Sequence, residues 1–91
     1  MQTGGRIGVG AIVNTHASVD HDYQIGAFAH IAPGAVLSGA VNVGEGAHIG
    51  VGTTVVEAIR VGAGALVAAG ACVINDVAPN GRVGGVPARN L

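Results

Sequence analysis

One feature governs what this 91-residue chain can fold into: an aliphatic residue recurs at every sixth position without interruption. We number the hexad from these residues, so that they occupy position one. Val, Ile and Leu make up only 25 of the 91 residues, so twelve matches in succession do not arise by chance. A short fixed period of this kind indicates a solenoid, in which each repeat stacks on its neighbours. The series is Ile7, Val13, Val19, Ile25, Ile31, Leu37, Val43, Ile49, Val55, Val61, Val67 and Val73.

The remaining hexad positions predict the shape of one coil. Position five, running from Ala11 to Val77, is small or apolar apart from Thr53. Residues two apart on a strand point the same way, so positions five and one should face inward and position six outward. Position four is Gly in six hexads, as a bend with positive φ favours. Position two is Gly in every third hexad from Gly8 to Gly62, so three hexads form one triangular coil.

The sequence therefore predicts an all-β fold, a parallel β-helix of about four coils with all twelve position-one residues buried. We expect an N-terminal lead-in over residues 1–6, the β-helix over 7–78 and a short Gly/Pro-rich tail over 79–91. No apolar run reaches the ~18 residues of a membrane span, so no membrane partner is expected. Net charge is −1 and the four arginines are scattered, which argues against nucleic acid as a partner. No signal peptide is apparent, and this favours a cytoplasmic protein.

The repeat departs from its own pattern in residues 14–30. Position four is occupied there in three successive hexads by His16, Asp22 and Phe28, and departures from a consistent pattern concentrate at functional sites. His21 lies between Asp20 and Asp22. A carboxylate beside an imidazole fixes its tautomer and raises its basicity, so His21 is a candidate general base. The other interpretation is a solvent-exposed histidine in a polar corner.

Other histidines and the single cysteine leave alternatives open. His30 and His48 both occupy position six and are three hexads apart, so we expect them to stack on one outer face. They either line a groove or form a surface ladder without function. His16 and His21 are spaced as H-x4-H, which admits a zinc site. Cys72 has no base or positive charge in its hexad, so we expect it to be passive.

With these motifs in view, the chain resembles the sialic acid/bacillosamine-type sugar acetyltransferases, which are hexapeptide-repeat acyltransferases. The resemblance covers essentially the whole chain, and His-Asp followed nine residues later by a second His is its specific part. It implies that the β-helix is left-handed, which the spacing alone does not determine. The residues that carry it are Asn14-Thr15, Val19-Asp20-His21-Asp22, the run Ile25-Gly26-Ala27-Phe28-Ala29-His30-Ile31-Ala32-Pro33-Gly34, and Gly85-Val86-Pro87-Ala88-Arg89.

The resemblance also implies an activity and the residues that serve it. The activity is N- or O-acetylation of a sugar or nucleotide sugar, with acetyl-CoA as the acyl donor and no metal. His21 matches the general base and Asp22 the adjacent acidic residue. The residues that match contacts with acetyl-CoA are His30, Val51, Ala69 and, less specifically, Arg89. The family forms homotrimers with active sites at subunit interfaces, where His21 of one prism would face acetyl-CoA on its neighbour.

Members of this family usually carry a small sugar-binding domain before the β-helix, and we expect these 91 residues to hold the β-helix part alone. Two alternatives to the enzyme therefore stay open. The first is a non-catalytic trimeric β-helix fragment or structural module. The second is a zinc-dependent, carbonic anhydrase-like hydratase that uses His16 and His21.

Overall fold

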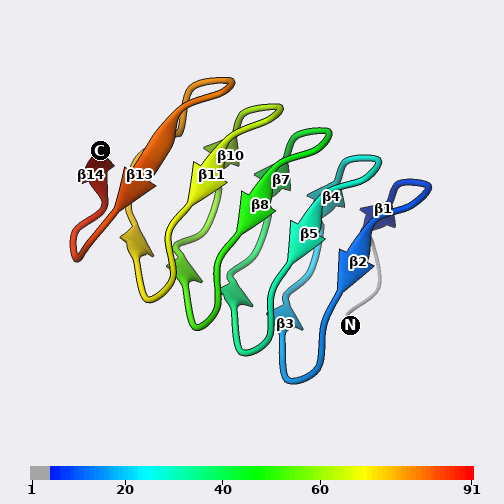
Figure 1. The fold of residues 1–91 in the computed structure, drawn as a ribbon. Coiled ribbons are helices and arrows are strands. Elements are labelled where there is room, and N and C mark those ends of the chain that lie inside the picture. Colours follow the sequence, from blue (N-terminus) through cyan, green and yellow to red (C-terminus); the bar gives the residue numbers. More distant parts are fainter. Residues whose placement is uncertain (1–4) are drawn as a thin grey trace.

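The short strands recur at every sixth residue, as the hexad predicts, and they stack along one axis (Figure 1). The computed structural model describes residues 5–91, so residues 1–4 of the expected lead-in lie outside the described part. Within residues 5–91 the chain has strands and turns but no helix, and hence no helix long and apolar enough to cross a membrane. It winds as a left-handed parallel β-helix, and this confirms the predicted fold class.

Three sheets form the sides of the prism, and every strand except β14 pairs in parallel with a strand one coil away. Sheet A consists of β1 (Arg6–Ile7), β4 (Gln24–Ile25), β7 (Asn42–Val43) and β10 (Arg60–Val61). Sheet B consists of β2 (Ile12–Val13), β5 (His30–Ile31), β8 (His48–Ile49), β11 (Leu66–Val67), β13 (Arg82–Gly84) and β14 (Arg89–Asn90). Sheet C consists of β3 (Ser18–Val19), β6 (Val36–Leu37), β9 (Thr54–Val55) and β12 (Cys72–Val73).

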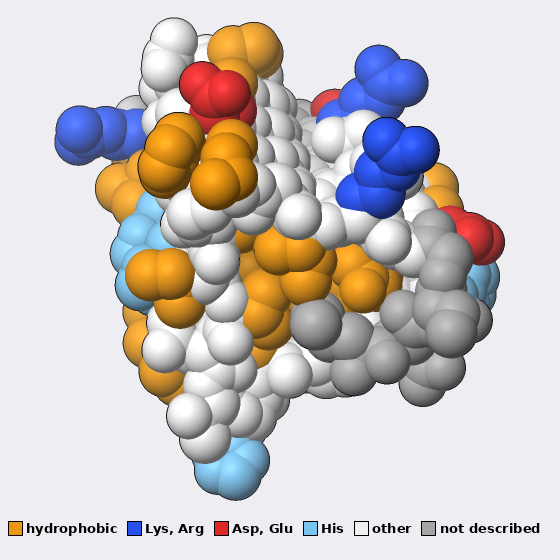
Figure 2. All heavy atoms as spheres, turned by 90° about the vertical axis from the view of Figure 1, so that its right-hand side faces the viewer, with side chains coloured by type: hydrophobic (Ala, Val, Ile, Leu, Met, Phe, Trp, Pro, Cys, Tyr) orange, Lys and Arg blue, Asp and Glu red, His pale blue; other side chains and the backbone are white. Residues whose placement is uncertain are grey.

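The core is a column of position-one and position-five side chains. From Val19 to Val73 every position-one residue is buried, as the hexad predicts. The prediction is wrong for the first coil, where Ile7 is 38% exposed and Val13 is half-buried. Figure 2 looks at this end of the prism and shows apolar side chains at its centre. They are exposed because, within residues 5–91, no coil lies above the first one.

The bends confirm the role assigned to position four. All residues at this position from Gly10 to Gly70 have positive φ. His16, Asp22 and Phe28 share this backbone conformation, with φ of 62°, 56° and 60°. Non-glycine residues enter this region at a cost, which Asp tolerates better than most residues. The irregular coil therefore keeps the shape of the others but carries His16, Asp22 and Phe28 at its corners.

The repeat ends by losing two residues from its frame. The hexad assigns Val77 to position five, but it forms a parallel bridge with Val61, a position-one residue. Position one of the last coil is thus reached two residues sooner after Val61 than the frame requires. The Asp76 carboxylate accepts a hydrogen bond from the Arg60 N–H at 2.8 Å, where a strand carbonyl would otherwise lie.

Residues 79–91, expected as a tail, contribute to sheet B. β13 pairs in parallel with β11, with Val83 beside Val67, and Val83 is buried. β14 then turns back and pairs antiparallel with β13. The prism therefore closes with part of a fifth coil and a reversed edge strand.

Candidate active site

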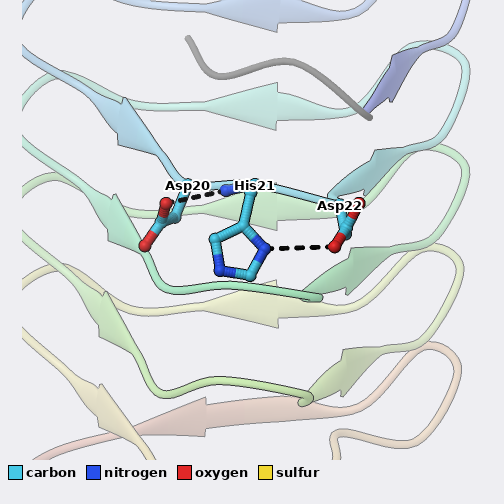
Figure 3. A network of polar contacts seen from close by, with 3 residues as sticks. All are labelled: Asp20, His21 and Asp22. Atoms are coloured by element: carbon cyan, nitrogen blue, oxygen red, sulfur yellow. Dashed lines mark hydrogen bonds and ion pairs between the residues drawn. The ribbon is translucent and has the colours of Figure 1, made fainter.

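The His21 corner joins sheet C to sheet A and lies between β3 and β4. The backbone N–H of His21 donates to Asp20 Oδ1 at 2.8 Å, and His21 Nδ1 lies 3.1 Å from Asp22 Oδ2 (Figure 3). An ionised carboxylate only accepts hydrogen bonds, so Nδ1 carries the proton and Nε2 keeps its lone pair. A neutral imidazole held in this tautomer is arranged as a general base is.

The backbone explains why the carboxylate reaches the ring. Asp22 is the bend residue of this corner, and its positive φ turns its side chain toward the imidazole that precedes it. The His21 and Asp22 side chains are 61% and 69% exposed. The pair is therefore open to an acceptor molecule or to a second protein chain.

His30 lies on the outer face of sheet B. The Asn14 amide nitrogen donates to His30 Nε2 at 2.8 Å, so the proton of the neutral ring lies on Nδ1. The ring stacks on His48 of the next coil, with centroids 4.7 Å apart and an interplanar angle of 26°. The expected stacking of His30 on His48 is confirmed, and the Asn14 contact adds a fixed tautomer to it.

The topology separates the two halves of the expected site within one chain. The corner that bears His21 joins sheets C and A, and in a triangular prism it lies opposite sheet B, which bears His30. Val51 and Ala69 are exposed one above the other at the corner between sheets B and C. Arg89 lies on β14 at the end of sheet B. The residues expected to bind acetyl-CoA thus share one side of the prism, and His21 does not lie on that side.

The two histidines of the zinc alternative are also apart. His16 lies at the corner between sheets B and C, whereas His21 lies at the next corner along the chain. Among residues 5–91 no three His, Cys, Asp or Glu side chains cluster as metal ligands would. A zinc site that used both histidines would need ligands from a second chain.

Two residues of the site were given no role by the sequence alone. Asn14 lies 16 residues before His30, two residues short of one full coil. The two side chains are therefore diagonal neighbours on one outer face. Gly39 follows His21 by one full coil, so it lies directly beneath the ring. Counting along the coil could have found both, although the direction of the side chains could not be read from it.

The three-sided β-helix is the fold of the hexapeptide-repeat acetyltransferase domains, and solved structures confirm the resemblance of this chain to them. One similar structure is the acetyltransferase domain of PglB from Neisseria gonorrhoeae, with 43% identity and a TM-score of 0.95. The match covers 97% of this chain and 43% of that chain. No protein-family model matches the sequence, and a comparison with curated proteins finds no match.

Other similar structures differ in the acceptor molecule. A variant of perosamine N-acetyltransferase from Caulobacter crescentus, in complex with CoA and GDP-perosamine, is 30% identical, with a TM-score of 0.79. That match covers 99% of this chain and 51% of that one. Serine acetyltransferase from Neisseria gonorrhoeae, in complex with serine, is 29% identical with a TM-score of 0.90, over 97% of this chain and 40% of that one. The chain thus spans about half, or less, of the length of the structures it matches.

Proposed function

We propose that this chain is the donor-binding β-helix of an acetyltransferase, which moves an acetyl group from acetyl-CoA to an amine or hydroxyl of a nucleotide sugar. The observation that carries the proposal is the His21–Asp22 corner, in which Nδ1–H is held by a carboxylate and Nε2 is free. Support comes from the PglB acetyltransferase domain in complex with acetyl-CoA, 39% identical to this chain, with a TM-score of 0.87 over 97% of this chain and 46% of that one. The complex that holds GDP-perosamine favours a sugar acceptor. Because acetyl-CoA serves as the donor, we place the reaction in the cytoplasm.

In this mechanism His21 Nε2 takes the proton of the acceptor as its nitrogen or oxygen attacks the thioester carbonyl carbon. The new C–N or C–O bond forms, the C–S bond breaks, and the leaving thiolate receives the proton as free CoA. Asp22 holds the ring in place and stabilises the imidazolium that forms between these two transfers.

The other site residues act on the donor. His30 presents Nδ1–H, because Asn14 occupies its Nε2, and this N–H can donate to the developing oxyanion of the thioester. The pantetheine arm would follow the corner that carries Val51 and Ala69. Arg89, exposed at the end of the same side, would meet a phosphate of CoA.

A homotrimer brings the two halves together. Sheet C runs between the His21 corner and the corner that carries Val51 and Ala69. Its outward residues are uncharged: Ser18, Val36, Thr54 and Cys72. Val36 is 41% exposed, and Ile74, which follows β12, is 46% exposed. The outward residues of sheet A are polar throughout: Arg6, Gln24, Asn42 and Arg60. With sheet C turned toward a threefold axis, the His21 corner of one chain meets the donor-binding side of the next.

The test combines calorimetry with a thiol-release assay. Acetyl-CoA should bind the assembled chain, and GDP-perosamine should accelerate the release of free CoA. Absence of acetyl-CoA binding would reject the donor half of the proposal. Release stimulated by serine instead of the nucleotide sugar would overturn the acceptor class. Binding with no release by either acceptor would favour the non-catalytic module.

A further inference from the structure

Gly39 is buried at a place where its counterparts in other coils are exposed. It occupies position three of the hexad at the corner between sheets C and A, one coil below His21. Glu57 and Asn75 occupy the same place in the following coils, and both are exposed. The ring of His21 lies against Gly39 and covers it, whereas Glu57 and Asn75 stay exposed.

The backbone gives no reason for a glycine at this position. The residue of this bend with positive φ is Ala40, at 59°, and φ of Gly39 lies outside that region. The backbone next to Gly39 is held as it is in other coils, because the Ala40 N–H donates to the His21 carbonyl at 2.9 Å. An alanine at position 39 would therefore suit the backbone.

What a side chain at position 39 would meet is the catalytic ring. An ideal Cβ built on Gly39 lies 2.8 Å from both Cε1 and Nε2 of His21, and 3.4 Å from Nδ1. Contacts of 2.8 Å are closer than real Cβ atoms make, so something would have to shift. The imidazole is the mobile and exposed partner, so the ring would move and the coil would keep its shape.

We propose that Gly39 is a positioning residue for His21. By lacking a side chain it lets the imidazole rest on the next coil, with Nδ1–H against Asp22 and Nε2 open to the acceptor. The catalytic consequence rests on the proposed function of His21, whereas the effect on the ring does not.

The direct test is the tautomer of His21, measured by nitrogen-15 NMR at a pH high enough to keep the imidazoles neutral. The wild-type chain should show His21 protonated at Nδ1, and His21→Ala identifies its signals. Gly39→Ala should reduce the Nδ1–H population, because the displaced ring loses the Asp22 carboxylate. Ser38→Ala is the matched control, a neighbouring change that adds no atom beneath the ring, and it should leave the tautomer unchanged. An unchanged tautomer in Gly39→Ala would overturn the proposal.

The transfer assay separates this proposal from the function on which it rests. Gly39→Ala should lower kcat about tenfold or more, a part of the 10²- to 10⁴-fold that a general base contributes, and leave the KM for acetyl-CoA unchanged. In the His21→Ala background the same change should have no further effect, because the two residues act as one unit. A changed tautomer with wild-type kcat would support Gly39 as a positioning residue and overturn His21 as the base. A fall in kcat with an unchanged tautomer would overturn the positioning role.

Folding is the remaining control. If Gly39→Ala unfolds the chain, the double variant His21→Ala/Gly39→Ala decides, since it removes the ring that the new methyl group meets. A folded double variant supports the proposal. An unfolded one shows that Gly39 serves the coil itself, and overturns it.

Discussion

The two histidines of the site have the same side chain but opposite hydrogen-bonding capacity. His21 gives its Nδ1–H to Asp22 and keeps Nε2 as an acceptor. His30 has its Nε2 occupied by Asn14 and keeps Nδ1–H as a donor. One contact per ring is enough to make the first suited to removing a proton and the second suited to stabilising an oxyanion.

Replacing His21 with alanine should lower kcat by roughly 10²- to 10⁴-fold, because the acceptor loses its general base. The affinity for acetyl-CoA should stay close to wild type, since other residues, His30, Val51, Ala69 and Arg89, are proposed to hold the donor. Asp22→Asn should lower kcat less, because that residue orients the ring and takes no proton. Steady-state kinetics and calorimetry check both effects. Wild-type turnover by His21→Ala would contradict the assignment and turn attention to Asp20 or His16.

Replacing His30 with alanine should act on the donor instead. The variant loses the Nδ1–H that sheet B presents beside the proposed thioester position, so the KM for acetyl-CoA should rise. Asn14→Ala should act in the same direction and less strongly, because His30 remains but its tautomer is released. Calorimetric titration with acetyl-CoA measures the change. An affinity for acetyl-CoA and a kcat that are both unaltered in His30→Ala would remove this residue from the site.

At this scale the sequence predicted contacts that follow from the coil itself. His21 and Asp22 are adjacent, and His30 and His48 are one coil apart, so their proximity is a matter of counting. The Asn14–His30 hydrogen bond depends on side-chain rotamers across a diagonal, which no period encodes. The placement of His21 and His30 on opposite sides of the prism follows from the hexad numbering, although it becomes plain only with the three sheets in view.

At the scale of the element, the strands that follow the hexad frame have only two residues each, and none is stable alone. Their stability comes from pairing with the coil on either side and from one inward side chain per strand. The glycine that recurs at position two once per coil serves this stacking, because the backbones of successive coils lie close together there. An ideal Cβ on Gly26 would lie 2.6 Å from the Glu45 nitrogen of the next coil, so a side chain there would push the coils apart.

An inward charge should therefore be far more damaging than an outward one. Ile49 is fully buried, and Ile49→Asp would bury an unpaired carboxylate at a cost of several kcal/mol, enough to unfold a chain of this size. Asn42→Asp is the matched control, because Asn42 is exposed at the outward position of β7. Urea denaturation followed by circular dichroism compares the two. A folded, soluble Ile49→Asp chain would contradict the hexad frame.

The frame was predictable up to Val73 and not beyond, for a specific reason. Val77 is aliphatic and inward whether it occupies position five of the old frame or position one of the shifted one. Nothing in the residue type therefore reveals the loss of two residues. β13 was missed for the same reason, because it is in register only after the shift, and β14 was missed because its antiparallel pairing lies outside the repeat.

The three sides of the whole molecule differ in chemistry. Sheet A presents arginine, glutamine and asparagine, sheet B presents the stacked histidines with Ile12 and Leu66 on either side, and sheet C presents small uncharged residues and Val36. A prism of this thickness has a small core, and domains of this size are marginal alone. Burying sheet C against other copies would remove uncharged surface from water, including that of Val36, which is 41% exposed.

We expect the chain to be a trimer in light scattering at micromolar concentration. Cys72 provides a probe of the face involved, because it occupies the outward position of β12 on sheet C and is the single cysteine of the chain. A thiol reagent should label it slowly in the trimer and faster under conditions that dissociate it. The control is Asn42→Cys in a Cys72→Ser background, which places the thiol on sheet A and should react at once. A stable monomer, or rapid labelling of Cys72 in the trimer, would contradict this arrangement.

The two-residue shift near Val77 also bears on where such a structure can stop. A coil that repeats perfectly offers its last turn as a template for another identical turn, including one from a different molecule. Here the final turn is out of phase, the Asp76 carboxylate already occupies the Arg60 N–H, and β14 runs against the direction of sheet B. An incoming coil would find neither the spacing nor the free donors that it needs. The two-residue shift in the repeat thus limits polymerisation at this end of the prism.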